Sequence, residues 1–483
     1  MIGIIDKATE PVVVNLPNRT IELDTLLINK HVTLSGCPGS QILLRKNSIV
    51  IEKESLIITE TIIVSDTTRS VFEIHPGTQL KLLDCAIKTK PKYTQQAVCI
   101  HIWSSKDSRT GSAKIINTSF KGYFTHILCG RRSSVIIEEC NFSSCNNSSI
   151  LTINADHLSI KDSVFTDCEE SNIEIRFTEP SSTDTKREVV ICGNTLSNSK
   201  GNGIIICANE VSGTIVSNTS ISIDKNILSL LKKDGIVLQN IDFHKEIFIT
   251  SNEVKNCGKN GIAVINSYPE KILISKNAVT KCKGAGVYIC KAVCEVSNCE
   301  ILQNENCGII LKEIDIVLTD PKAHQITIHD SEIKNNKEDG IAIYSSKNLL
   351  ALLENNNIEG NRKNGLRIDT NVVEGNTSDK CENVYKNAER KLKETGNITV
   401  KNGKIVFNKN GGILIKNSYL TLDYPTIQGN THTALDIKGS YKKIKLTNKT
   451  LIHHKIVGKT ILNGENIDIY KRKKICCTGC RII

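Results

Sequence analysis

The chain has 483 residues, abundant isoleucine, valine and leucine, and few aromatic residues, which make up 4% of it. Its formal net charge is +11, but lysines and acids alternate through most of the sequence, as on a solvated surface rather than a concentrated basic face. We therefore expect no nucleic-acid partner, and no apolar run reaches the roughly 20 residues of a membrane-spanning helix.

The first residues, MIGIIDKATEP, do not resemble a secretory signal. Asp6 and Lys7 interrupt the apolar stretch before a signal-peptide core can form. Nineteen cysteines without the paired spacing of a disulfide framework then favour reduced, mostly buried thiols. These features predict a cytoplasmic protein.

Residues 21–165 hold short apolar strands in an irregular repeat, as in TLLINKHVTLSG and SVIIEECNFSSC. The recurrent phrase is a strand, an acidic residue, Cys or Ser, and then Phe or Ile. We interpret these strands as the first coils of a solenoid, preceded by a cap at residues 1–20.

A clearer repeat follows between residues 202 and 437, with phrases such as SNEVKNCGKNGIAV, HDSEIKNNKEDGIAI and ENNNIEGNRKNGLRI. One glycine precedes each apolar pair, at Gly203, Gly235, Gly261, Gly286, Gly308, Gly340, Gly365 and Gly412. The spacings are 32, 26, 25, 22, 32, 25 and 47 residues, and we interpret the last as two coils with an insertion. Such a glycine gives a backbone position without a side-chain clash.

Strands this short cannot bury an apolar face alone, so coils of about 20–26 residues must stack on one another. The sequence predicts an all-β fold, a right-handed parallel β-helix over residues 21–445, followed by a C-terminal segment at 446–483. Four turn asparagines are expected to form an inward ladder: Asn256, Asn304, Asn335 and Asn408.

Two interruptions are expected. Residues 179–184 form an exposed loop. Residues 378–396 predict a short helical insertion, since Val384, Ala388 and Leu392 share one face and Gly396 can end it. This helix either covers the solenoid wall or binds a partner.

The sequence shows no catalytic motif. Hydrolysis would need two carboxylates across a groove, and the Asn-Thr-Asp phrase of polygalacturonase-like chains does not occur. Stacking can still bring together distant acids, such as Asp162, Asp330 and Asp339, although solvated turn acids are the simpler interpretation. We lean toward a protein that is not an enzyme and assign no catalytic residue.

Clusters of cysteine and histidine are candidates for metal sites. The densest thiol group is Cys282, Cys290, Cys294, Cys299 and Cys307, whose spacing is not that of a zinc site. The pair His453 and His454 has no evident partner ligand. We expect stacked interior cysteines, and neither a metal nor a cofactor.

The C-terminal tail carries a lipidation-like pattern. Cys480 lies four residues from the end, although Arg481 departs from a prenylation box. A second membrane signal is supplied by two possible palmitoylation sites and a basic run: Cys476, Cys477, Lys471, Arg472, Lys473 and Lys474. The tail predicts peripheral attachment to an anionic membrane surface, whereas a frayed tail or a thiol metal site is the alternative.

The repeat phrases quoted above resemble those of the right-handed β-helix superfamily that includes pectin-lyase-like enzymes. Within it, ENNNIEGNRKNGLRI and HDSEIKNNKEDGIAI are most similar to coils of the intracellular Shc-binding adaptor proteins and the F-box β-helix proteins. The resemblance implies a fold and carries no catalytic residue, and no F-box-like helical module is present.

We therefore predict an intracellular scaffold or adaptor that presents the solenoid to an unknown protein partner and is tethered by its tail. The alternative is a carbohydrate-binding or polysaccharide-cleaving protein. It would need paired acids and aromatic platforms on one face, for which four residues are candidates: Trp103, Tyr123, Tyr288 and Tyr344.

Overall fold

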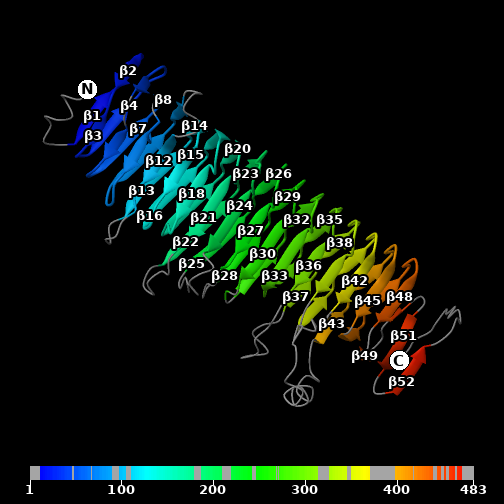
Figure 1. The fold of residues 1–483 in the computed structure, drawn as a ribbon. Coiled ribbons are helices and arrows are strands. Elements are labelled where there is room, and N and C mark those ends of the chain that lie inside the picture. The colour runs from blue at the N-terminus through cyan, green and yellow to red at the C-terminus, as the bar shows by residue number, and fades with distance from the viewer. Residues whose placement is uncertain are drawn as a thin grey trace, which may run out of the picture. The chain divides into compact units, whose positions relative to one another are not determined.

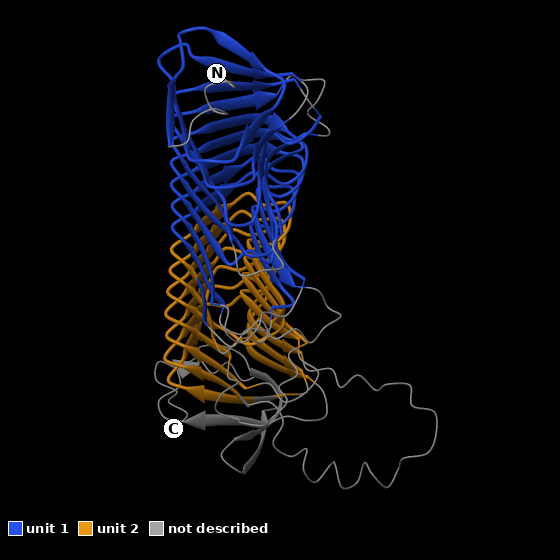
Figure 2. Ribbon diagram, turned by 90° about the vertical axis from the view of Figure 1, so that its left-hand side faces the viewer, with its two compact units in different colours: residues 1–248 blue, residues 249–483 orange. Residues whose placement is uncertain are grey.

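A computed structural model describes residues 11–45, 48–66, 68–89, 97–104, 110–178, 186–208, 219–241, 246–267, 269, 271–313, 326–344, 350–369, 397–416, 418–438, 443–447, 451–452, 456–462 and 465–469. Within these ranges every regular element is a β-strand, which confirms the all-β prediction. The chain divides into unit 1, Met1–Phe248, and unit 2, Ile249–Ile483 (Figure 2). The predicted helix at 378–396, the loop at 179–184 and the tail from residue 470 lie outside the described residues.

Unit 1 is built from three parallel sheets, A, B and C, and each coil of the chain adds one strand to each (Figure 1). Sheet A contains β1 Val12–Asn15, β4 Val32–Ser35, β7 Ser55–Thr59, β10 Gln79–Leu83, β13 Gly111–Ile116, β16 Ser133–Glu138, β19 His157–Lys161, β22 Arg187–Cys192 and β25 Thr219–Asp224. Sheet B contains β2 Thr20–Leu23, β5 Gln41–Leu44, β8 Ile62–Ser65, β11 Ala86–Thr89, β14 Ser119–Tyr123, β17 Asn141–Cys145, β20 Val164–Cys168, β23 Thr195–Ser197 and β26 Ile227–Ser229. Sheet C contains β3 Leu26–Ile28, β6 Ile49–Ile51, β9 Phe72–Ile74, β12 Val98–Ile102, β15 Thr125–Cys129, β18 Ile150–Ile153, β21 Ile173–Phe177, β24 Ile204–Ala208 and β27 Ile236–Gln239.

Unit 2 repeats this arrangement. Its sheet A contains β31 Lys271–Ser275, β34 Glu295–Ser297, β37 Ile326–His329, β40 Ala351–Glu354, β43 Asn397–Lys401, β46 Tyr419–Asp423 and β49 Lys443–Thr447, and β28 Glu246–Thr250 spans the unit boundary. Sheet B contains β29 Glu253–Lys255, β32 Ala278–Thr280, β35 Glu300–Leu302, β38 Glu332–Lys334, β41 Asn357–Glu359, β44 Lys404–Val406, β47 Thr426–Gln428 and β50 Leu451–Ile452. Sheet C contains β30 Ile262–Ser267, β33 Val287–Ala292, β36 Ile309–Lys312, β39 Ile341–Tyr344, β42 Asn364–Asp369, β45 Gly411–Lys416, β48 Thr433–Lys438 and β51 Ile456–Leu462, and β52 Glu465–Ile469 pairs antiparallel with β51.

Strand register fixes the length of each coil. Ala113 pairs with Val135, a coil of 22 residues, whereas Leu158 pairs with Val189, a coil of 31. Coils without an insertion therefore have the expected length. The predicted boundaries at residues 20 and 445 remain predictions, although β1 already pairs with β4.

One expected coil count is wrong. Leu366 pairs directly with Ile413, so the 47 residues between Gly365 and Gly412 form one coil that contains β43 and β44, not two. The extra length falls in residues 370–396, outside the described ranges.

The core consists of the inward side chains of three sheets, because alternate residues of a strand face opposite sides. In β39, Ile341 and Ile343 are fully buried, whereas Tyr344 is half-buried on the outside. In unit 1 three rings stack inside sheet B: Phe120, Phe142 and Phe165 lie with successive centroids 4.7 Å apart. Because neighbouring strands of a sheet lie about 4.8 Å apart, identical aromatic residues in register stack face to face.

The repeated glycines of unit 2 sit where the next coil approaches closely. A Cβ atom on Gly286 would lie 2.3 Å from Cγ2 of Ile301 and 2.8 Å from the carbonyl oxygen of Gly308. Gly308 and Gly340 are obstructed in the same way by their following coils. The spacing seen in the sequence therefore has a steric cause.

An asparagine ladder lines the next turn inside unit 2, formed by Asn304, Asn336, Asn361, Asn408 and Asn430. The backbone N–H and Nδ2 of each donate to Oδ1 of the next, at 2.9–3.0 Å. The prediction is correct for Asn304 and Asn408 and wrong for Asn256 and Asn335, which are exposed one position earlier with φ values of 55° and 57°. Asparagine tolerates that left-handed conformation, so two adjacent turn positions both select it.

Candidate functional site

The acids singled out in the sequence lie at separate places. Asp162 belongs to unit 1, where it follows β19. In unit 2, Asp330 follows β37 of sheet A, whereas Asp339 precedes β39 of sheet C. Stacking therefore does not unite these three carboxylates.

The four candidate aromatic platforms also separate. Tyr123 is fully buried in the core of unit 1, so the prediction that it could form a platform is wrong. Trp103, also in unit 1, is 44% exposed and lies against His101 with ring centroids 4.4 Å apart. Tyr288 and Tyr344 both lie on sheet C of unit 2, on strands β33 and β39.

The outer face of sheet C in unit 2 gathers charged and aromatic side chains in register. Tyr344 pairs with Asp369, and Asp369 pairs with Lys416, on three successive strands. Arg367 lies on the same face as Asp369, two residues earlier. We call Asp339, Tyr344, Arg367, Asp369 and Lys416 the Arg367 site.

Asp369 is the centre of this site. Its side chain is only 5% exposed, and its Oδ2 accepts hydrogen bonds from Nη2 of Arg367 at 3.2 Å and from Nζ of Lys416 at 3.0 Å. Its Oδ1 is buried without a hydrogen-bond partner among the described residues. A buried acceptor left unpaired costs about 1–3 kcal/mol, so a donor that reached this oxygen would form a stabilising hydrogen bond.

The guanidinium of Arg367 links the other members. Its Cζ lies 5.2 Å from the ring centroid of Tyr344, and its Nη1 lies 4.0 Å from Oδ2 of Asp339. Burial opposes its charge, but the hydrogen bond to Asp369 and the nearby acids raise the pKa of Arg367. Arg367 therefore stays charged and offers a flat, partly exposed cationic surface.

Asp339 is 1% exposed, and its Oδ1 accepts from the backbone nitrogen and Nδ2 of Asn364, both at 2.8 Å. Burial raises its pKa despite these hydrogen bonds. Asp339 and Asp369 are thus two buried carboxyl groups in different surroundings, and both lie beside the guanidinium of Arg367.

Sequence reasoning found Asp339 and Tyr344 but missed Arg367, Asp369 and Lys416. A weak signal exists, because the alternation in NGLRID places Arg367 and Asp369 on the side opposite Leu366 and Ile368. Lys416 is 47 residues from Asp369, and only the strand register shows that they meet.

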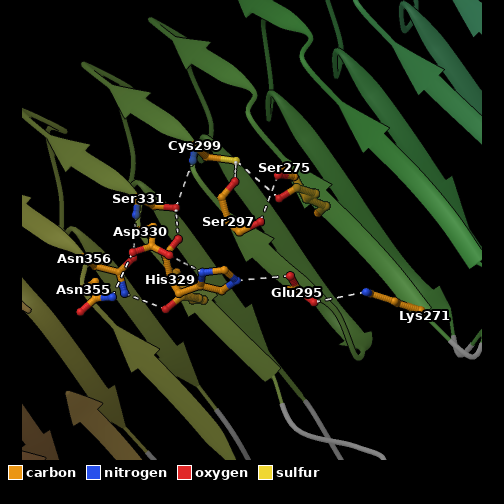
Figure 3. A network of polar contacts seen from close by, with 12 residues as sticks. Lys271, Ser275, Glu295, Ser297, Cys299, His329, Asp330, Ser331, Asn355 and Asn356 are labelled. Atoms are coloured by element: carbon orange, nitrogen blue, oxygen red, sulfur yellow. Dashed lines mark hydrogen bonds and ion pairs between the residues drawn. The ribbon is translucent and has the colours of Figure 1, made fainter. Parts of the chain in front are cut away.

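A second polar network lies on sheet A of unit 2 (Figure 3). Nδ1 of His329 lies 2.7 Å from Oδ2 of Asp330, and its Nε2 lies 3.2 Å from Oε1 of Glu295. Lys271 approaches Glu295 at 3.6 Å, and Asn355 donates to Asp330. Both ring nitrogens are engaged, so His329 is a structural imidazole rather than a free base.

This network predicts a pH-dependent stability. Burial lowers the pKa of His329, whereas its hydrogen bonds to Asp330 and Glu295 raise it. The hydrogen bonds outweigh burial, so the pKa of His329 lies above its ordinary value. The stabilisation is complete below the ordinary histidine pKa of about 6.5 and is lost as pH rises through the higher folded value. We expect the Tm of the protein to fall over this range more than that of a His329→Gln variant. Parallel slopes in differential scanning calorimetry would contradict the assignment.

Other titratable histidines and acids give a common background in that comparison. His126 is fully buried, and burial lowers its pKa to about 3, so it does not titrate near neutrality. Lys271 and Glu354 flank the network on β31 and β40 and are unchanged in the variant. The difference between the two proteins therefore reports His329.

The cysteines and the cavity add no chemistry to these sites. The five cysteines between residues 282 and 307 are buried and form no disulfide bond, and the described residues contain no cluster of metal-ligating side chains. An open cavity of about 450 Å³ in unit 1 is lined by exposed polar groups that include Glu60, Asp84, Asn117 and Glu139. No described helix is long and apolar enough to cross a membrane.

A family model described as "Right handed beta helix region" matches residues 212–366 and, in an overlapping match, residues 315–473. Together these matches span more than half of the chain. No curated protein sequence matches it.

Several solved structures share the fold at low identity. A mutant of a periplasmic alginate epimerase aligns with a TM-score of 0.47 and 14% identity, over 69% of this chain and 81% of that one. Tailspike protein 3 of bacteriophage CBA120 aligns with a TM-score of 0.36 and 11% identity, over 84% of this chain and 54% of that one. The A-module of an Azotobacter vinelandii mannuronan C-5 epimerase aligns with a TM-score of 0.33 and 12% identity, over 74% of this chain and 90% of that one. At these values the likeness concerns the fold alone.

Proposed function

The chain belongs to the right-handed β-helix family, and we propose that it binds and processes a saccharide on the outer face of sheet C in unit 2. One observation carries the proposal: Asp369 is buried between two cations that share its Oδ2, while its Oδ1 has no hydrogen-bond partner within the part of the chain that the structure describes. A sugar hydroxyl is a donor suited to this oxygen, since charge-assisted hydrogen bonds of this kind are strong.

The surrounding residues fit the same ligand class. Sugar rings combine hydroxyl groups with apolar faces, and apolar faces pack on aromatic side chains. Tyr288 and Tyr344 lie two coils apart, and Tyr288 is in register with Ala342, so the tyrosines are separated by about 9.6 Å across the strands and about 6.6 Å along them, a spacing that a short oligosaccharide can span. The guanidinium of Arg367 adds further donors between them and Asp369.

The two carboxyl groups of the Arg367 site fit different roles. Burial raises the pKa of Asp339, so it holds its proton to higher pH than an ordinary carboxyl and suits a proton donor. Asp369 accepts hydrogen bonds from Arg367 and Lys416 through its Oδ2, which fits it to the binding of a ligand hydroxyl.

We expect Asp369→Asn to weaken oligosaccharide binding about tenfold or more, because it removes a charged acceptor. The measurement is titration calorimetry with the best ligand from a glycan array. Asp436→Asn is the matched control, since Asp436 is an outward acid of β48 that pairs with Lys438 at 3.0 Å. Absence of any glycan ligand for the wild type, or equal affinity in Asp369→Asn, would refute the proposal.

The scaffold function, the adaptor resemblance and the cytoplasmic location remain predictions. Their most specific residues, Cys476, Cys477 and Cys480 with the basic run at 471–474, lie outside the described part of the chain. The saccharide proposal rests on described residues and is independent of them.

A further inference from the structure

A line of cations follows the turn between sheets B and C in unit 2. Three positions of this turn stack from coil to coil through backbone hydrogen bonds, such as those from Arg362 to Asn336 and from Lys409 to Asn361. Seven exposed cations occupy these positions: Lys259, Lys281, Lys283, Lys337, Arg362, Lys363 and Lys409. We call them the basic ridge.

Few acids neutralise the basic ridge. Lys337 pairs with Glu305 at 2.8 Å, and Lys363 pairs with Glu338. The described residues give the remaining five cations no ion-pair partner. Since coils repeat about every 4.8 Å, neighbouring cations repel one another, and an anionic surface would relieve that repulsion.

An exposed aromatic ring stands among these cations. Phe407 is 57% exposed and lies two residues before Lys409, at a backbone φ of 54°. A bulky side chain is rarely found in this left-handed conformation. Asn256 and Asn335 occupy the same turn position in earlier coils, where asparagine is suited to it.

The neighbouring coil accommodates the ring. Gly429 has no side chain, and a Cβ atom there would lie 2.4 Å from Cδ1 of Phe407. Lys281 and Gln303 take the same φ at this turn position, so the turn itself directs the side chain outward, and in this coil that side chain is a large apolar ring.

Among the described residues of unit 1, Leu230 shows the same combination. Leu230 is 55% exposed at a φ of 56°, and two exposed lysines, Lys232 and Lys233, follow it. An exposed apolar side chain flanked by Lys and Arg is the pattern of proteins that lie on anionic bilayers, where the cations meet headgroups and the apolar group enters the interface.

We propose that the basic ridge and Phe407 form a docking surface for an anionic lipid bilayer. The row of cations attracts the negatively charged headgroups over a long range. Phe407 then inserts at the boundary between the headgroups and the acyl chains. This surface shares no residue with the Arg367 site or with the predicted lipidation tail, so it does not depend on the saccharide proposal.

The test uses the full chain produced without lipidation, in sedimentation with vesicles of phosphatidylcholine alone or mixed with phosphatidylserine. The wild type should bind the mixed vesicles preferentially. Arg362→Glu with Lys409→Glu should lower the partition coefficient about tenfold or more. Phe407→Ser should lower it several-fold while retaining the preference for phosphatidylserine.

Matched controls lie on the same unit. Tyr424 is another aromatic residue at a φ of 54°, 47% exposed, but it precedes β47 at the opposite end of sheet B, so Tyr424→Ser should bind like the wild type. Lys404→Glu reverses an exposed charge away from the turn. Asp369→Asn should also bind normally.

Three results would overturn the docking surface. These are wild-type binding that ignores phosphatidylserine, loss of binding in the controls equal to that in the ridge variants, and capture of soluble dextran sulfate without capture of vesicles. The last would assign the ridge to a soluble polyanion.

Discussion

Asn336→Leu is expected to destabilise unit 2 by about 3 kcal/mol or more. Leucine is similar in size, so the loss comes from hydrogen bonds. Oδ1 of Asn336 accepts from the backbone nitrogen and Nδ2 of Asn304, both at 3.0 Å, while its Nδ2 donates to Asn361 and to the carbonyl oxygen of Ile301. The variant leaves these buried groups unpaired, at about 1–3 kcal/mol each.

Hydrogen exchange is the measurement of choice, because each coil contacts mainly its neighbours and the loss should be local. Protection should fall most in strands β35 and β41, on either side of β38 in the same sheet. The adjacent, exposed Asn335 supplies the control: Asn335→Asp keeps a residue that tolerates a φ of 57° and should change stability by less than about 0.5 kcal/mol. Unchanged protection in Asn336→Leu would mean that the ladder contributes nothing.

The contrast between Asn335 and Asn336 shows what a sequence can establish. The repeat of glycine and apolar residues was sufficient for the β-helix, because stacked coils give each residue nearly the same surroundings as its counterpart one coil away. It did not identify which of two adjacent asparagines faces inward. The reason is that the outward position needs a left-handed backbone and the inward one needs hydrogen bonds, and asparagine serves both.

The Arg367 site was less accessible to sequence reasoning. Asp339 and Tyr344 stood out as an isolated acid and an isolated aromatic residue, but their meaning depends on partners one and two coils later. The distance along the chain between Asp369 and Lys416 includes residues 370–396, so a fixed repeat length would have paired Asp369 with the wrong residue. Register, which decides cross-strand neighbours, is not encoded in any local motif.

The sequence also did not show which polar aromatic side chains are buried. Tyr123 was a candidate platform because tyrosine is often half-exposed, yet it is fully buried in unit 1 with His126, and the two ring centroids lie 6.0 Å apart. Nothing in the alternation of THILC distinguishes an inward histidine from an outward one. The stack of Phe120, Phe142 and Phe165 was visible only as a repeated phrase ending in Phe.

Phe142→Ala should destabilise unit 1 by about 3–5 kcal/mol, the usual cost of removing a buried phenylalanine. The ring of Phe142 is fully buried and stacked on both sides, with interplanar angles of 4°, and it also lies 5.6 Å from the ring of His126. Its removal opens a cavity between two rigid neighbours that cannot move together, because the strand spacing holds them apart.

The histidine beside that cavity provides a second readout. Burial is the main cause that lowers the pKa of His126 to about 3, so water entering the cavity should raise this pKa toward its ordinary value. NMR titration of the His126 ring would detect the change, and hydrogen exchange in β14 and β20 would report the loss of stability. Val164→Ala, at an outward residue of β20 that is 38% exposed, should alter neither measurement appreciably. If Phe142→Ala lowered protection yet left the pKa of His126 at about 3, the coils would have closed over the gap and the packing of the stack would be adaptable rather than rigid.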